Sequence, residues 1–158
     1  MNFLKHILTS STFLAFLLFC SCEEEVEIDT EYPEIDIAFD EAFPKQCSSI
    51  NRGETFIFKA RFTDNIQLGG YSVDIHHNFD HHTHSTEVND CDMEAVKAPD
   101  NPFLFIQNYA IPEGQNEYVA EMEIEVPENV DSGDYHFMIL LTDAEGWQTI
   151  KGLSIKIN

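Results

Sequence analysis

Basic residues are scarce in this 158-residue sequence, in which eight lysines and arginines stand against 29 aspartates and glutamates. The formal net charge is −21. Nucleic acids and bare anionic lipid surfaces are bound through basic patches, so this scarcity excludes both as expected partners. A cation or a basic partner fits the charge better, although acidity also keeps exported proteins soluble.

A helical hydrophobic stripe and the common catalytic motifs are also missing. There is no H-E-x-x-H segment, and Ser85 and Thr86 lack the G-x-S-x-G context of a nucleophilic serine. A single small domain without these features is not expected to be an enzyme. A metal-dependent hydrolase remains a third alternative to the two binding functions discussed below.

Only one long apolar run is present, ILTSSTFLAFLLF, and it follows Lys5 and His6 near the start of the chain. It is too short to span a bilayer and is typical of an export signal. Ser21 is the small residue that lipoprotein signal cleavage before Cys22 requires, whereas Phe19 makes Cys20 a poorer anchor. We therefore predict a lipoprotein signal peptide at 1–21, with an ordinary secreted protein as the alternative.

The segment 22–32 is expected to be an acidic tether, because EEEVEIDTEYPE is dominated by like charges that repel one another. Such a run behind the cysteine resembles the signal that sends lipoproteins of one large group of Gram-negative bacteria to the cell surface. The expected location is the outer membrane, exposed at the cell surface and held only by the lipid anchor. Removal of the signal, which contains Lys5 as its one charged residue, changes the net charge to −22.

Cys47 and Cys91 are the only cysteines after the anchor. An even pair in an exported chain favours a disulfide, and the absence of a C-x-x-C spacing argues against a thiolate metal site. Such a bond would fasten the far end of the histidine-rich segment.

The segment 33–158 alternates apolar and polar residues with a period of two, which predicts an all-β domain. About seven strands are expected, at 35–39, 53–64, 71–79, 102–112 and 117–127, with two more in 133–158 joined by the turn at 143–146. This number and spacing predict an Ig-like antiparallel β-sandwich. In 53–64 the alternation places Phe56, Phe58, Ala60 and Phe62 on one face of the strand. The expected inward positions of the other strands are Tyr71, Val73, Ile75, His77, Phe79, Tyr118, Ala120, Met122, Ile124, Val126, Tyr135 and Phe137.

The segment DSGDY supports this fold, because Asp131, Gly133 and Tyr135 match the tyrosine corner that begins strand F of Ig-like sandwiches. The chain departs from antibody domains at two positions. Phe137 occupies the place of the second core cysteine, and Trp147 follows the last turn instead of lying on strand C.

Three segments, DIHHNFDHHTHS and the later YHF and TDAEGWQT, carry a resemblance to a known family, the first of them most specifically. On these residues the chain resembles an uncharacterised family of small bacterial lipoproteins that carry one Ig-like domain of unknown function. The resemblance covers about residues 33 to 158. It implies the fold and the lipid anchor, and it implies no activity.

Five of the seven histidines lie in the nine residues HHNFDHHTH, from His76 to His84. Alternation places Asp74 and His76 on the outer face of their strand and His77 on the inner face. In an Ig-like sandwich strands C and F pair antiparallel, so we expect His136 to lie outward beside His76. Opposite residues on paired strands are close enough for two imidazoles to share one ion.

The sequence thus predicts a surface site for zinc, copper or nickel, since nitrogen ligands with carboxylates suit these ions better than calcium. The candidate ligands and orienting carboxylates are His76, His81, His82, His84, His136, Asp74 and Asp80.

Two other interpretations stay open. The histidines could form a structural network without an ion, because neighbouring carboxylates favour the protonated imidazole that cannot bind metal. They could also belong to a sugar- or protein-binding patch edged by Tyr71, Phe79 and Trp147. Each of the three interpretations is compatible with a non-catalytic binding or adhesion module.

A second candidate cation site lies in two turns with oxygen-bearing side chains. Asp64 and Asn65 follow one strand, and Asp143 and Glu145 follow another. Calcium would suit such oxygens, although Asp and Asn are equally common in turns for conformational reasons.

Overall fold

A computed structural model describes residues 28–84 and 91–158. Strands make up all of the regular structure in these ranges, where no helix is long and apolar enough to cross a membrane. The signal peptide, Cys22, most of the tether, Ser85 and Thr86 lie outside the described residues. The strands are β1 (Glu34–Asp36), β2 (Ser49–Ile50), β3 (Thr55–Thr63), β4 (Leu68–His77), β5 (Phe105–Ala110), β6 (Glu117–Glu125), β7 (Gly133–Asp143) and β8 (Gln148–Ile157).

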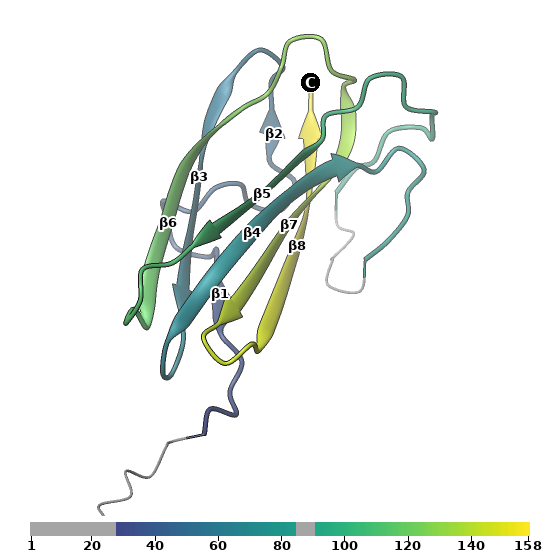
Figure 1. Cartoon of the computed structure of the whole chain (residues 1–158). Helices are drawn as coiled ribbons and strands as arrows, with labels where there is room; N and C mark the ends of the chain where they lie inside the picture. The colour runs from purple at the N-terminus through teal and green to yellow at the C-terminus, as the bar shows by residue number, and fades with distance from the viewer. Residues whose placement is uncertain (1–27, 85–90) are drawn as a thin grey trace, which may run out of the picture.

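The strands form two sheets that pack face to face as a β-sandwich (Figure 1). One sheet has the order β1-β3-β6, and the other has the order β2-β8-β7-β4-β5. This is the arrangement of an Ig-like domain with β4 as strand C and β7 as strand F, which confirms the predicted fold. The pair β2 and β8 is parallel, which the prediction of a purely antiparallel sandwich did not include.

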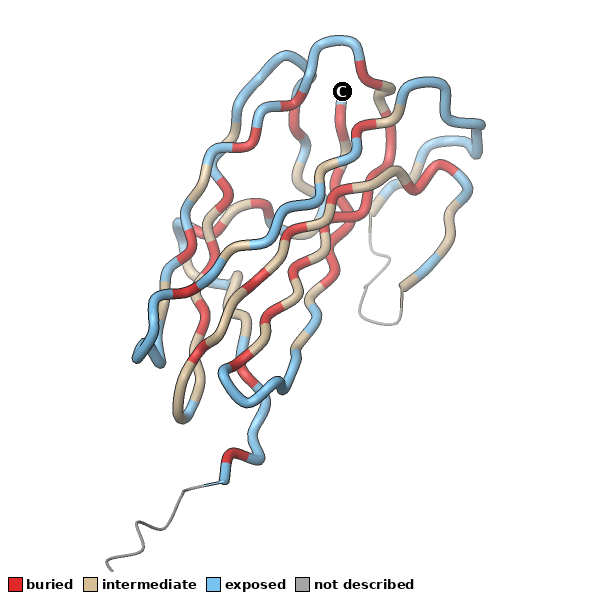
Figure 2. Tube along the Cα trace, viewed as in Figure 1, coloured by how far each residue is buried: buried red, intermediate tan, exposed pale blue. Residues whose placement is uncertain are grey.

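Alternation of the side chains builds the core between the sheets (Figure 2). The predicted inward positions are buried or half-buried, so the period of two located the core correctly. Phe58 on β3 and Phe137 on β7 stack across the two sheets with ring centroids 5.5 Å apart. This aromatic pair joins the sheets at the position where antibody domains have their core disulfide.

The tyrosine corner is confirmed at the start of β7. Buried Tyr135 donates a hydrogen bond from Oη to the carbonyl oxygen of Asp131 at 2.7 Å, and Oη accepts one from the backbone N–H of Phe103 at 3.1 Å. These bonds fix where β7 begins and therefore which of its residues lies opposite each residue of β4.

The β4–β7 ladder runs through the middle of its sheet and has a candidate site at each end. Leu68 pairs with Asp143 at one end, and His76 pairs with His136 near the other. Leu68 and His76 are eight positions apart on extended chain, a distance of about 26 Å. β4 ends at His77, so Phe79 lies beyond the strand and not within it as predicted.

Within the described residues, contacts with the domain reach back to Asp29, four residues before the expected boundary at 33. The indole Nε1 of Trp147 donates to the carbonyl oxygen of Asp29 at 3.2 Å. The ring of Tyr32 packs on that of Trp147 with centroids 5.0 Å apart. The last residues of the expected tether are therefore part of the folded domain.

Candidate metal centre

The register of β4 and β7 places His76 directly opposite His136, as the sequence predicted. Asp74 lies two residues before His76 on the same face of β4, and its carboxylate accepts a 2.7 Å hydrogen bond from Nδ1 of His76. A carboxylate that holds one ring nitrogen fixes the tautomer and directs the other nitrogen outward with its lone pair. The nitrogen of His76 that is available to a metal ion is therefore Nε2.

The chain reverses direction immediately after β4. The backbone N–H of Asn78 donates to the carbonyl oxygen of Asp134 at 2.8 Å, and the ring of Phe79 is buried. His81 has φ 59°, in the left-handed region that permits a sharp turn, and its N–H donates to the carbonyl oxygen of Asn78. The loop that follows is thereby folded back over the end of β7.

A glycine makes room for the buried ring of Phe79. Gly133 at the start of β7 has φ 129°, which side-chain-bearing residues rarely adopt. A Cβ at this position would lie 2.9 Å from a ring carbon of Phe79. The glycine thus allows both the conformation of β7 and the close approach of the ring.

Folding back of the loop brings four imidazoles together. Each offers a nitrogen that lies within 4.8 Å of the corresponding nitrogens of the others. The Nε2 atoms of His76 and His84 are 3.3 Å apart. Ring centroids in the group are between 4.6 and 5.7 Å apart. The four residues, called the histidine cluster below, are His76, His82, His84 and His136.

His136 is completely buried, so the prediction that it would be an exposed residue was wrong. The returning loop covers it, and the rings of His82 and His84 each lie 4.6 Å from its ring. Burial lowers the pKa of His136 to about 3, and the neighbouring histidines act in the same direction. Its imidazole is therefore neutral at physiological pH, which is the state that binds a metal.

Hydrogen-bond partners also orient His82 and His136 of the cluster. Asp80 accepts a 2.6 Å hydrogen bond from Nδ1 of His82, and this bond lowers the pKa of the Asp80 carboxyl group. Nε2 of His136 donates to the carbonyl oxygen of His82 at 3.2 Å. A carbonyl oxygen only accepts, so the neutral ring of His136 keeps its lone pair on Nδ1. Partners of this kind orient the ligands of metal sites in proteins.

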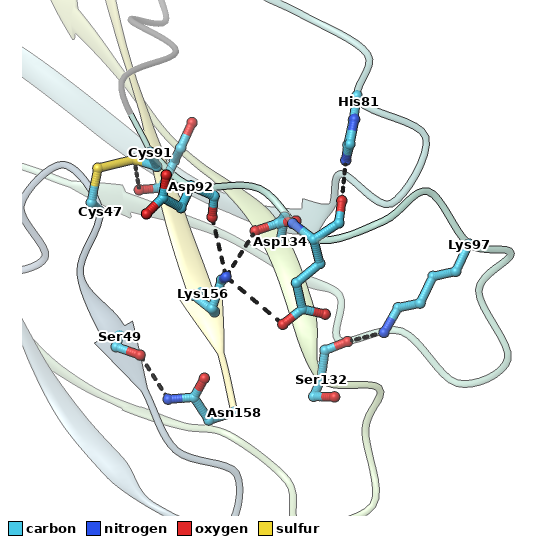
Figure 3. A network of polar contacts seen from close by, with 12 residues as sticks. Cys47, Ser49, His81, Cys91, Asp92, Lys97, Ser132, Asp134, Lys156 and Asn158 are labelled. Atoms are coloured by element: carbon cyan, nitrogen blue, oxygen red, sulfur yellow. Dashed lines mark hydrogen bonds and ion pairs between the residues drawn. A yellow bond between two sulfur atoms is a disulfide. The ribbon is translucent and has the colours of Figure 1, made fainter.

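Two other histidines of the segment lie outside the cluster. Nε2 of His81 donates to the carbonyl oxygen of Glu94 at 2.9 Å (Figure 3). His77 is half-buried with its ring 5.0 Å from that of Phe79, which agrees with the predicted inward direction. Asp74 and Asp80 contact imidazoles of the cluster without belonging to the group of converging ligand atoms.

The structure does not support the predicted aromatic edge of a binding patch. Tyr71 and Phe79 are buried in the core. Trp147 is 37% exposed, but it lies beyond Asp143, at the opposite end of the β4–β7 ladder from the histidines. The three side chains therefore cannot line one surface together with the cluster.

The predicted disulfide between Cys47 and Cys91 is present (Figure 3) and fixes the position of Cys91, which follows the histidine segment in the sequence. It holds the chain after Cys91 against β8, where Nζ of Lys156 donates to the carbonyl oxygen of Asp92. Farther along this stretch, the N–H of Glu94 donates to a carboxylate oxygen of Asp134 at 2.7 Å. The chain after Cys91 is thus fixed to two strands of the sheet.

This stretch, Cys91 to Lys97, in turn holds the residues that follow β4. The N–H of Lys97 donates to the carbonyl oxygen of Phe79, and its ammonium group lies 4.5 Å from the centre of the Phe79 ring. Sequence reasoning anticipated the disulfide but missed these contacts, because the stretch has no periodic pattern.

An Ig-like β-sandwich with a cluster of four imidazoles at one end defines the molecule as a small all-β domain with a candidate metal centre. The chain belongs to the family described as a domain of unknown function, DUF4625, whose model matches residues 20–158. This confirms the resemblance noted in the sequence. No curated protein matches the chain.

Two solved structures resemble the chain at low identity. One is a mutant of the SrpA adhesin from Streptococcus sanguinis, with 17% identity, a TM-score of 0.44 and coverage of 83% of this chain. The chain spans 57% of the length of that adhesin chain. The other is a Niemann-Pick type C2 protein from the Japanese carpenter ant, with 12% identity, a TM-score of 0.44, and coverage of 81% of this chain and 90% of that chain.

Proposed function

We propose that this protein is a lipid-anchored, non-catalytic binding module of the cell surface whose histidine cluster holds one zinc ion. The observation that carries the proposal is the convergence of four imidazole nitrogens within 4.8 Å of one another. Two of the histidines lie on paired strands and two on the returning loop, so a bound ion would join the loop to the sheet.

The geometry and the type of ligand favour zinc among the transition metals. Tetrahedral zinc with bonds of about 2.0 to 2.1 Å to nitrogen separates its ligand nitrogens by about 3.3 to 3.4 Å. The Nε2 atoms of His76 and His84 are 3.3 Å apart. Copper(II) and nickel(II) prefer tetragonal arrangements, in which neighbouring ligand nitrogens lie closer together than in a tetrahedron.

Four protein ligands also argue for a non-catalytic role. Catalytic zinc keeps a coordination position open for water or substrate, whereas four side-chain ligands close the coordination sphere. The cavity of about 400 Å³ beside the Cys47–Cys91 disulfide has no member of the histidine cluster in its lining. A bound zinc ion would therefore stabilise the loop or mediate binding rather than activate a water molecule.

A histidine network without a metal is the second candidate. The 3.3 Å contact between the two Nε2 atoms also suits an N–H···N hydrogen bond, in which one ring donates and the other accepts. In this case the cluster would stabilise the loop for recognition of a sugar or protein. Metal content separates the two candidates.

The position of the cluster supports a role in contacts away from the anchor. The first described contacts of the chain lie near Trp147, at the Asp143 end of the β4–β7 ladder, and the cluster lies at the other end. In a protein anchored through Cys22, a ligand or a metal ion would then bind at the end of the domain that faces away from the membrane.

The first prediction concerns metal content. Untagged protein comprising residues 23–158, purified without chelator, should contain close to one zinc per chain by elemental mass spectrometry. A His82→Ala, His84→Ala variant should contain less than about a tenth of this amount, because two of the four ligands are lost. Both histidines lie on the loop, so their replacement leaves the core intact.

The matched control is His81→Asn, which removes a histidine of the same segment that lies outside the cluster. Asparagine tolerates the left-handed conformation at this position. This variant should keep its zinc. Metal-free wild-type protein whose thermal stability does not change on addition of zinc would disprove the zinc site and favour the hydrogen-bonded network.

The second prediction concerns the anchor. Cys22→Ser should abolish the lipid modification, because the thioether to the lipid forms on the cysteine sulfur. Intact-mass spectrometry of the membrane fraction should show the lipid mass on wild-type protein and on Cys20→Ser, and not on Cys22→Ser. Protease treatment of whole cells should remove the wild-type domain if it is exposed at the surface. An unmodified wild-type chain that is released to the medium would contradict the proposed anchor.

A further inference from the structure

Three carboxylates from distant parts of the sequence meet at the opposite end of the β4–β7 ladder from the histidine cluster. Asp29 precedes β1, Asp64 follows β3, and Asp143 ends β7. Each offers an oxygen that lies within 4.8 Å of those of the other two. Sequence reasoning had singled out Asp64 and Asp143, but it gave no reason to add Asp29.

Hydrogen bonds orient each of these carboxylates through one oxygen only. Oδ1 of Asp29, Oδ2 of Asp64 and Oδ1 of Asp143 each accept two hydrogen bonds of 2.6 to 3.0 Å. The donors are Glu31 N and Asn65 Nδ2 for Asp29, Ile66 N and Gln67 N for Asp64, and Gly146 N and Trp147 N for Asp143. Ordinary turn chemistry therefore explains one oxygen of each side chain.

Turn chemistry does not explain the remaining oxygens. Oδ2 of Asp29, Oδ1 of Asp64 and Oδ2 of Asp143 are buried, and no donor in the described part of the chain reaches them. Asp29 is 5% exposed and Asp143 is 4% exposed. None of the ion pairs between described residues involves any of the three. Burial of like charges close together without a cationic partner is strongly unfavourable, so this arrangement calls for a cation.

We infer that Asp29, Asp64 and Asp143 bind a calcium ion through these three oxygens. Hard divalent cations prefer oxygen ligands, and calcium accepts the irregular arrangements that separate loops provide, with water completing its six to eight ligands. Magnesium requires near-octahedral geometry and gives up its water reluctantly, so it fits less well. A shallow cavity of about 200 Å³, lined in part by Asp64 and Asn65, gives solvent access next to the site.

Calcium at this position would fasten the beginning of the domain to two turns. The β3–β4 turn, the β7–β8 turn and the entering chain lie at the same end of the sandwich (Figure 1). The indole of Trp147 already holds the backbone of Asp29. The ion would thus fix the point at which the chain from Cys22 enters the domain. This inference is independent of the zinc proposal, because the two groups share no residue.

The test is thermal unfolding of wild-type protein freed of metal by chelator and gel filtration. Calcium at about a hundred times its Kd should raise Tm by about 5 to 10 °C, since the ion binds the folded chain and not the unfolded one. Magnesium should give a clearly smaller shift. The His82→Ala, His84→Ala variant should keep the calcium response. No rise in Tm at 10 mM calcium would overturn the inference.

Asp143→Asn is the variant that tests the calcium site, because asparagine removes the charge but keeps the carbonyl oxygen that accepts hydrogen bonds from the turn. Without metal it should be at least as stable as wild type, since one buried charge is gone, and it should not respond to calcium. Asp64→Asn should behave in the same way and provides a second variant if the first does not fold. A calcium response of either variant equal to that of wild type would also overturn the inference.

Glu145→Gln is the matched control, because it removes a charge from the same turn while leaving the three converging carboxylates unchanged. It should respond to calcium like wild type. A second readout is cleavage after Glu31 by a glutamate-specific protease, which calcium should slow in wild type and in Glu145→Gln but not in Asp143→Asn. Loss of the response in Glu145→Gln would point to general charge screening and overturn the site.

Discussion

Replacement of Cys47 and Cys91 by alanine should lower the free energy of unfolding by about 4 kcal/mol, because the disulfide closes a long loop in the unfolded chain. The two cysteines are 44 residues apart in the sequence. Urea unfolding of oxidised wild type and of the double variant, both freed of metal, measures the difference.

The same double variant should bind zinc more weakly. The disulfide fixes the stretch that begins at Cys91, and Lys97 of that stretch holds Phe79 through its backbone N–H and its ammonium group. Loss of such a supporting contact costs metal sites about 10- to 100-fold in affinity. Wild type treated with reductant should behave like the variant. Unchanged zinc affinity in the two samples would show that the loop is held without the disulfide.

The pairing of His76 with His136 is the part of the site that sequence reasoning predicted most directly. It required the period of two in each strand, the tyrosine corner and the antiparallel pairing of strands C and F in Ig-like sandwiches. The two residues are 60 positions apart, and the first two inputs are local patterns. Local patterns therefore suffice where regular strands carry the residues and the fold class supplies the pairing of the strands.

Local patterns could not predict that His136 is buried or that Asp29 lies beside Asp64 and Asp143. His136 is buried because a loop without periodicity turns back over it, and the turn depends on the fit of Phe79 against Gly133. Asp29 lies beside Asp64 and Asp143 because Nε1 of Trp147 donates to its backbone carbonyl oxygen. Both arrangements are set by packing between segments distant in the sequence, which alternation in one segment cannot reveal.

The two candidate cation sites, one at each end of the β4–β7 ladder, explain part of the strong acidity of the chain. Asp74 and Asp80 hold imidazoles of the cluster, and three further aspartates converge at the other end. Acidity for solubility alone would distribute the charges over the surface, whereas Asp29 and Asp143 are buried. Part of the net charge of −21 is thus placed where cations would offset it.

Phe79→Ala should lower the free energy of unfolding by about 3 to 5 kcal/mol, the usual cost of removing a fully buried phenylalanine ring. The ring is 2% exposed and packs edge-on against Tyr135 at 5.3 Å. Because Phe79 anchors the turn that leads to His82 and His84, zinc affinity should fall in parallel by at least tenfold. Urea unfolding without metal and zinc titration of the folded variant measure the two effects separately.

Phe62→Ala separates loss of the anchor from general destabilisation. Phe62 is as deeply buried as Phe79, but it lies on β3 in the other sheet. It is close in sequence to Leu68, which begins β4 at the end of the β4–β7 ladder away from the histidine cluster. The Phe62→Ala variant should therefore lose about as much stability as Phe79→Ala and keep wild-type zinc affinity as long as the protein is folded. Equal loss of zinc affinity in both variants would show that the cluster depends on the stability of the whole sandwich, and that Phe79 has no special role in positioning the returning loop.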